Sequence, residues 1–279
     1  MTTLSIPRSL PVMGRSPGRR PPDGERLHVT RADLGAALAA AGPETSLPAI
    51  VWSHATTALR LATCGIRYLQ HGSAASDAYR RMTTAEFHLI NGRQAWANWR
   101  TITYNLSGNL PIDRPLTVLD LCSGTGDSTQ VLAWWLPAGS RIIAVELDPR
   151  FAAAASKRDY HNRHGDPIAV DVRCASVLET FADADGRPLD AGSVDVVHAI
   201  GSIGCHFKAA ESAAIIAECA RVLRHDGFAM LDTGSRGTSA EELQRLADGV
   251  GLQVTGQQRS WWLDRYRQLI LRKAERLAA

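Results

Sequence analysis

Short apolar runs alternate with segments of helical periodicity along the C-terminal part of the chain. The run at 118–121 is broken by Gly124 and Gly126, and residues 128–136 then place apolar side chains at helical spacing. A strand that turns through glycines into a helix is the local geometry of a nucleotide pocket, because glycine lets the backbone approach a ligand closely. The pattern therefore predicts an α/β fold with such a pocket at this turn.

A second apolar run follows at the distance that such a pocket requires. It covers residues 141–146 and ends in Glu146, about 20 residues after the glycines, where a carboxylate can bind the hydroxyls of a ribose. Asp148 and Pro149 are typical of a helix N-cap and first helical residue, and Gly165 is expected to end that helix. We therefore interpret Glu146 as the ligand-binding candidate and Asp148 as structural.

The alternation continues toward the C-terminus. The remaining segments resemble consecutive elements of a known family. They are a strand and loop at 170–177, a strand at 193–200, a loop at 201–207, a helix, turn and strand at 220–232, and two strands at 252–260 and 265–273.

Taken together, these segments resemble a known family. The motif Val118-Leu-Asp-Leu-Cys-Ser-Gly-Thr-Gly-Asp127 and the later segments follow the order found in class I S-adenosylmethionine-dependent methyltransferases, over roughly residues 115–275. The resemblance implies a doubly wound α/β fold with a seven-stranded sheet, six parallel strands plus one antiparallel. It also implies S-adenosylmethionine as the cofactor and S-adenosylhomocysteine as the product.

The resemblance assigns roles to residues near the carboxyl ends of the predicted strands. Gly124 and Gly126 would contact the methionine end through backbone, and Glu146 would bind the ribose. Cys122 stands where the family often has its first glycine, and Ser176 stands where it usually has an acid near the adenine amino group. Leu147 and Val177 would flank the adenine. The expected cofactor site comprises Asp120, Cys122, Gly124, Gly126, Glu146, Leu147, Ser176, Val177 and Gly201.

His206 is the first candidate for a catalytic residue. It follows the fourth strand, where related small-molecule methyltransferases place residues beside the methyl group, and an imidazole can take a proton near neutral pH. A histidine that only hydrogen-bonds within its loop is an equal alternative. His198 lies within the predicted strand and is interpreted as a core histidine. His161 and His164 are interpreted as favourable charges at a helix end, and no metal site is expected.

Other candidates have competing structural interpretations. Asp232 ends the fifth strand, so it lies either in the site region or as a cap for the turn that follows. Trp261 and Trp262 occupy the turn before the last strand, on the ligand side if the sixth strand is parallel to its neighbours, and packing against a helical lid is the favoured role. Trp262 and His88 are the substrate-binding candidates, although a solvated helix face also explains Glu86 and His88.

The N-terminal part of the chain differs in character. Residues 1–28 are rich in Pro, Arg and Gly and are expected to form a mobile tail. Helical patterns follow: Thr30 caps a segment that stops near residue 42, and 46–69 and 76–106 carry apolar faces. In the family such an extension commonly folds over the site as a lid. We expect residues 29–112 to form a lid, substrate or dimerisation region and residues 113–279 to form the cofactor-binding core.

Composition narrows the class of protein. Apolar residues make up 45% of the chain, and a formal net charge of +3 is too small to imply a nucleic-acid partner. The five cysteines show no paired metal spacing and are interpreted as reduced packing residues. We find no apolar run that spans a bilayer and no signal peptide, so we expect a cytoplasmic protein without a membrane partner.

Other functions require motifs that this sequence lacks or departs from. A nicotinamide dehydrogenase needs three glycines in Gly-x-Gly-x-x-Gly spacing, which Asp120 and Thr129 do not supply. Nucleic-acid amine methyltransferases carry an Asn or Asp-Pro-Pro-aromatic sequence after the fourth strand, whereas this chain has Ala199-Ile-Gly-Ser-Ile. Aminopropyl transfer needs an acidic cluster there. The departures at Cys122 and Ser176 keep a non-catalytic binding protein open, although an unpaired Glu146 would then be costly.

The expected function is methyl transfer from S-adenosylmethionine to a small organic acceptor, a specialised natural-product metabolite, in a chamber closed by the N-terminal helices. Acceptor carbon, oxygen and nitrogen remain open, and a homodimer through those helices is expected. The alternatives are a nucleic-acid methyltransferase and a non-catalytic protein that binds the cofactor.

Overall fold

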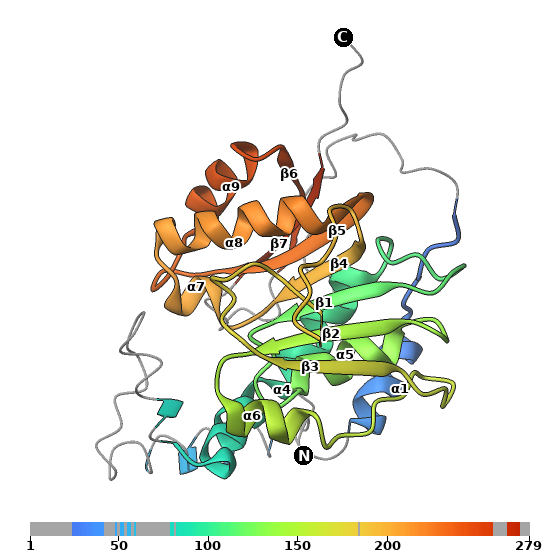
Figure 1. The fold of residues 1–279 in the computed structure, drawn as a ribbon. Coiled ribbons are helices and arrows are strands. Elements are labelled where there is room, and N and C mark those ends of the chain that lie inside the picture. The colour runs from blue at the N-terminus through green and yellow to red at the C-terminus, as the bar shows by residue number, and fades with distance from the viewer. Residues whose placement is uncertain are drawn as a thin grey trace, which may run out of the picture.

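A seven-stranded sheet organises the protein (Figure 1). The computed structural model describes residues 24–41, 48, 51–52, 55–56, 59, 79–80, 82–183, 185–258 and 267–273. The strand order across the sheet is β3-β2-β1-β4-β5-β7-β6. The strands are β1 (Thr117–Leu121), β2 (Arg141–Glu146), β3 (Ala169–Cys174), β4 (Val194–Ala199), β5 (Leu223–Thr233), β6 (Leu252–Gln258) and β7 (Arg267–Lys273).

Strand direction confirms the predicted fold class. The pairs β1–β2, β2–β3, β1–β4 and β4–β5 are parallel, whereas β7 is antiparallel to both β5 and β6. Six strands therefore share one direction and β7 alone opposes them. The expectation that the sixth strand has parallel neighbours is wrong, because β7 lies between β6 and β5 and pairs with both.

Both faces of the sheet are buried, which explains why its strands are continuous apolar runs. Alternate side chains point into two cores: Leu119 and Val197 belong to one, Val118 and Val196 to the other. Figure 1 shows α8 and α9 over one face and α4 and α5 over the other. The helices are α1 (Arg31–Ala40), α4 (Thr84–Leu106), α5 (Asp127–Trp135), α6 (Pro149–Ala155), α7 (Ile203–His206), α8 (Ala209–Val222) and α9 (Ala240–Asp248).

The N-terminal residues that the structure describes are packed onto this core. Thr30 caps α1 as predicted, with a capping box to Asp33. The helix expected at 76–106 is observed as α4, with residues 79–80 helical ahead of it, and most of 46–69 lies outside the described residues. The expected mobile tail is corrected at its end, because the amide of Leu27 donates to the carbonyl of Leu110 at 2.9 Å and the Leu27 side chain is buried.

Two helix boundaries differ from the sequence prediction. The helix α6 ends at Ala155 rather than near Gly165, because the chain turns back to bury Tyr160, whose hydroxyl donates to the carbonyl of Ala155 at 3.0 Å. The predicted turn between α8 and the fifth strand is absent, since α8 ends at Val222 and β5 begins at the next residue. Both boundaries are set by packing rather than by a glycine stop.

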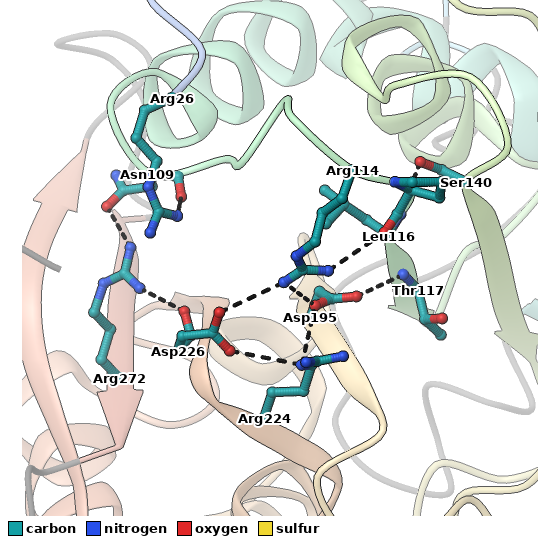
Figure 2. Close-up of polar contacts among 11 residues, drawn as sticks. Arg26, Asn109, Arg114, Leu116, Thr117, Ser140, Asp195, Arg224, Asp226 and Arg272 are labelled. Atoms are coloured by element: carbon teal, nitrogen blue, oxygen red, sulfur yellow. Dashed lines mark hydrogen bonds and ion pairs between the residues drawn. The ribbon is translucent and has the colours of Figure 1, made fainter. Parts of the chain in front are cut away.

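At the amino ends of the strands, charged side chains form the network that Figure 2 shows. The carboxylate of Asp195 accepts from the amide of Thr117 at 2.8 Å and pairs with Arg114 at 2.7 Å. Arg224 lies within 3.6 Å of both Asp195 and Asp226. Arg272 donates to the carbonyl of Asp226, and burial lowers the pKa of Arg272 to about 10. The network links the starts of β1, β4 and β5.

The turn from β1 into α5 follows a left-handed path. Cys122 has a φ of 54°, and Gly124 and Gly126 have φ values of 56° and 89°. Among the described residues, Cys122 is the only residue other than glycine that has a positive φ. An L side chain in this region is strained, so the cysteine at this position needs support from its surroundings.

Replacing Cys122 tests this backbone conformation. The variants Cys122→Gly and Cys122→Ala both remove the thiol, but only alanine keeps a Cβ in the left-handed region. We expect the glycine variant to be more stable than the alanine variant by about 1 kcal/mol. Urea unfolding of both proteins measures the difference, and equal unfolding midpoints would contradict the left-handed turn.

Replacing Asp195 tests the network at the amino ends. We expect Asp195→Ala to lower the free energy of unfolding by about 2–4 kcal/mol, because a buried amide loses its acceptor and an arginine loses its partner. Asp226→Ala is the matched control, since the Asp226 side chain is 37% exposed and its pairs should contribute less than about 1 kcal/mol. Similar losses in both variants would show that Asp195 is not the centre of the network.

Candidate active site

The carboxyl ends of three parallel strands bring three acidic side chains to one edge of the sheet. Asp120 lies in β1, Glu146 ends β2, and Asp232 lies at the end of β5. Their exposed fractions are 0%, 9% and 1%. Buried carboxylates are costly unless they are hydrogen-bonded, so the contacts of each acid define what it does.

Glu146 joins the glycine turn to the loop after β2. Its Oε2 accepts from the amide of Gly124 at 2.8 Å, and its Oε1 accepts from the amide of Asp148 at 2.9 Å. Burial raises the pKa of Glu146, while these backbone hydrogen bonds lower it. Among the described residues, no arginine or lysine forms an ion pair with this carboxylate. Its remaining acceptor capacity is therefore available to a ligand.

Asp120 forms its hydrogen bonds with buried residues of the fold next to the glycine turn. Its Oδ2 accepts from the hydroxyls of Ser128 at 2.9 Å and Thr129 at 2.7 Å, which fixes the start of α5. Its Oδ1 lies 2.7 Å from Nδ1 of His198, which is fully buried. The interpretation of His198 as a core histidine is confirmed, and Asp120 supports the glycine turn.

Asp232 organises the loop after β4. Its carboxylate accepts from the amides of Ser202, Ile203 and Gly204 at 3.0–3.3 Å. Burial raises its pKa, and these amides act in the opposite direction. Of the two alternatives for Asp232, the structure favours a place in the site region, because the carboxylate caps the start of α7. Gly204 is needed there, since a Cβ would collide with the backbone of Thr233.

The remaining side chains of the glycine turn are also enclosed. Burial raises the pKa of the Cys122 thiol far above its ordinary value, and the charge of Glu146 acts in the same direction. The thiol is therefore protonated at neutral pH and is a packing group rather than a nucleophile. The hydroxyl of Ser123 is buried without a hydrogen-bond partner in the described structure.

The loops after β2 and β3 present apolar side chains beside the turn. Leu147 is 49% exposed and Leu178 is 44% exposed, whereas Val177 is buried in the core. The hydroxyl of Ser176 accepts from the amide of Leu178 at 3.2 Å and keeps its own proton for donation. The sequence prediction omitted Leu178, because exposure of an apolar residue is visible only in the folded chain.

His206 ends α7 and contacts a residue from the N-terminal region. The hydroxyl of Tyr79 lies 2.8 Å from Nε2 of His206. The carbonyl of Tyr79 accepts from Arg150, which follows β2. Sequence reasoning missed Tyr79 and Arg150, since neither belongs to a motif. Gly201, at the start of the same loop as His206, has a φ of 67°.

The substrate-binding candidates are placed only in part. His88 lies on α4, whose backbone is described there, but its side chain lies outside the described residues, as does that of Glu86. Trp261 and Trp262 lie outside the described residues as well. The ends of their loop are placed, because Arg267 pairs with Thr233 at the carboxyl end of β5.

Comparisons with known proteins agree on one kind of domain. Residues 118–227 match a family model described as a methyltransferase domain. No curated protein sequence matches the chain. No helix in the described parts is both long enough and apolar enough to cross a membrane.

Solved structures share the fold at low sequence identity. A S-adenosylmethionine-dependent methyltransferase from Leishmania major matches with a TM-score of 0.51 and 16% identity, over 68% of this chain and 77% of that one. A second such enzyme, from Clostridium acetobutylicum, has a TM-score of 0.50 and 11% identity, over 68% and 98% of the two chains. Mitomycin 7-O-methyltransferase has a TM-score of 0.50 and 14% identity, over 87% and 72%.

The matched region begins in β1 and reaches into β5, so it contains the glycine turn, Glu146 and the loop that carries His206. The cofactor of this family is S-adenosylmethionine. Residues 118–227 form a methyltransferase domain, which supports the resemblance to class I S-adenosylmethionine-dependent methyltransferases.

Proposed function

We propose that the protein transfers a methyl group from S-adenosylmethionine to a small organic acceptor beneath its own N-terminal region. The observation that supports this proposal is the contact between Tyr79 and His206, which joins a residue ahead of α4 to the loop after β4. A site that the chain itself covers suits a small acceptor better than a nucleic-acid strand, which requires an open basic groove.

The residues at the carboxyl edge fit the cofactor. Glu146 and Asp232 are buried there and form no ion pair with an arginine or lysine of the described chain, so the site favours a ligand with positive charge. S-adenosylmethionine carries a sulfonium and has a net positive charge. The buried hydroxyl of Ser123 offers a polar group to a ligand at the turn. The left-handed Gly124 and Gly126 suit close backbone contact with the methionine end.

The other cofactor contacts follow from the placement of the loops. Glu146 binds the ribose hydroxyls while it holds the glycine turn, and Leu147 and Leu178 provide apolar walls for the adenine. The hydroxyl of Ser176 donates a hydrogen bond to the edge of the adenine ring, and Val177 packs in the core beneath the adenine. Asp120 and Cys122 act through the conformation of the turn, and Gly201 lets the chain bend away from the site.

The chemistry divides between the cofactor and the chain. The bound cofactor supplies a methyl group on a sulfonium, which is open to in-line attack by a nucleophile. His206 takes the proton from the acceptor as the new bond forms. Alignment of the acceptor by the enclosing residues lowers the barrier, and exclusion of water removes a competing nucleophile.

A neighbour of the same fold supports a specialised metabolite as the acceptor. Mitomycin 7-O-methyltransferase is named for methylation of an oxygen on a natural product, and its likeness extends over 87% of this chain. We therefore favour an acceptor of that size, with a hydroxyl as its reacting group. A homodimer through the N-terminal helices, and substrate contacts by His88 and Trp262, stay predictions.

Replacing Glu146 tests the ribose contact. We expect Glu146→Gln to weaken S-adenosylhomocysteine binding about 10- to 100-fold, because charge-assisted hydrogen bonds are lost. Isothermal titration calorimetry measures the dissociation constant. Glu179→Gln, a change of equal charge at an exposed position on the neighbouring loop, should leave binding unchanged.

The same titration has a pH dependence. The pKa of Glu146 is raised above its ordinary 4.5, so wild-type affinity should fall as the pH drops through that raised pKa and the carboxyl gains a proton. The Glu146→Gln variant should lack this fall. Equal affinity of wild type and Glu146→Gln at neutral pH would remove Glu146 from the cofactor site.

Replacing His206 tests the acceptor side. We expect His206→Asn to lower kcat about 10²- to 10⁴-fold on any acceptor that wild type methylates, with unchanged affinity for S-adenosylhomocysteine. Release of S-adenosylhomocysteine over a panel of phenols, alcohols and amines provides the assay. His225→Asn is the matched control, because His225 is exposed near the amino end of β5, away from the site. Full activity of His206→Asn would exclude it as the base.

A further inference from the structure

Tyr79 and His206 meet although they lie 127 residues apart in the chain. The Tyr79 hydroxyl is 2.8 Å from Nε2 of His206, and the two rings are nearly perpendicular at 86°, with centroids 5.4 Å apart. One residue therefore contacts the imidazole both through a hydrogen bond and through its ring. This contact limits rotation of the imidazole.

The backbone of Tyr79 is anchored by a single arginine. Arg150 donates through Nη2 to the carbonyl of Tyr79 at 3.0 Å and through Nη1 to the carbonyl of Met82 at 2.6 Å. The same guanidinium binds both carboxylate oxygens of Asp148, at 2.6 and 3.0 Å. This pairing holds the pKa of Asp148 below its usual range. Arg150 thus holds Tyr79 and Met82 against the helix that follows β2.

Aromatic packing provides a second, independent anchor. The ring of Phe87 stacks on Phe151 of α6 with a centroid distance of 3.9 Å and an angle of 19°. Tyr79 packs its ring edge-to-face with Phe87 at 5.5 Å. Met82, between them in the chain, is fully buried. The side chain of Tyr79 is therefore directed by its packing as well as by the carbonyl contact.

The backbone beneath His206 is fixed from the opposite side. Asp232 accepts from the amides at the start of α7, and the carbonyls of Ile203 and Gly204 accept from Thr238 and Gly237 at 3.0 and 2.8 Å. The backbone of His206 is thus held on one side, and the Tyr79 hydroxyl contacts its side chain.

We propose that Tyr79 is a positioning residue for His206, and that Arg150 holds Tyr79 in place for this purpose. A hydrogen bond to one ring nitrogen sets the orientation of an imidazole and biases which nitrogen carries the proton. His206 acts as a base when Nε2–H donates to the Tyr79 oxygen, because Nδ1 then keeps the lone pair that accepts a proton. Tyr79 thereby completes the base. This inference rests on the proposed function, since it assigns His206 a role in methyl transfer.

The variant Tyr79→Phe removes the hydroxyl and keeps the ring. We expect the side-chain nitrogen resonances of His206 to shift in ¹⁵N NMR spectra, assigned by their absence from His206→Asn. We also expect kcat to fall about 10- to 100-fold, the scale of a displaced catalytic group, while the affinity for S-adenosylhomocysteine is unchanged. Tyr104→Phe on α4 is the matched control and should change neither readout, because the Tyr104 side chain is exposed.

Arg150→Lys tests the anchor, since lysine keeps the charge but cannot bridge two carbonyls and a carboxylate as a planar fork does. We expect it to move the same His206 resonances, and we expect the double variant with Tyr79→Phe to lose less than the sum of the single effects. Additive losses would show that Arg150 acts elsewhere.

The outcomes separate this inference from the proposed function. Unchanged His206 resonances in Tyr79→Phe overturn the positioning role. Shifted resonances with an unchanged kcat overturn it as well, while methyl transfer stands. If wild type methylates no acceptor, the proposed function fails, and the resonances alone decide whether Tyr79 holds the imidazole.

Discussion

The carboxylate of Glu146 is the contact on which the rest of the site depends. One oxygen holds the amide of Gly124 in the turn after β1, and the other holds the amide of Asp148 at the start of α6. Asp148 in turn binds Arg150, which holds the backbone of Tyr79. A single buried acid thus connects the glycine turn to Tyr79 through hydrogen bonds. Backbone amides are the donors to Glu146, and the Arg150 guanidinium is the donor to Asp148 and to the Tyr79 carbonyl.

The carboxylates at the two edges of the sheet have different partners. At the amino edge, Asp195 and Asp226 are neutralised by Arg114 and Arg224, so the charges there stabilise the fold (Figure 2). At the carboxyl edge, Glu146 and Asp232 are held mainly by backbone amides, and burial raises the pKa of both. Backbone amides stabilise a carboxylate without cancelling its charge. The carboxyl edge therefore retains a negative field that suits a sulfonium.

Much of the core was predictable from residue patterns, because buried parallel strands and a glycine turn leave strong local signals. The seven strands, the cap at Thr30 and the structural role of Asp148 are confirmed. The end of α6 was predicted wrongly, since burial of Tyr160 stops the helix before Gly165. The partners of Asp232 were left open, because the loop after β4 offers three amides that a sequence pattern does not reveal.

The sequence by itself determined the fold class, the family and the position of Glu146, since each depends on side-chain type at short, regular spacing. Only the tertiary structure decided what surrounds His206. Arg150 binds carbonyl groups, which every residue has, and Tyr79 reaches the imidazole from 127 residues away. Contacts of this kind depend on where the backbone lies after folding, so no motif or periodicity in the chain records them.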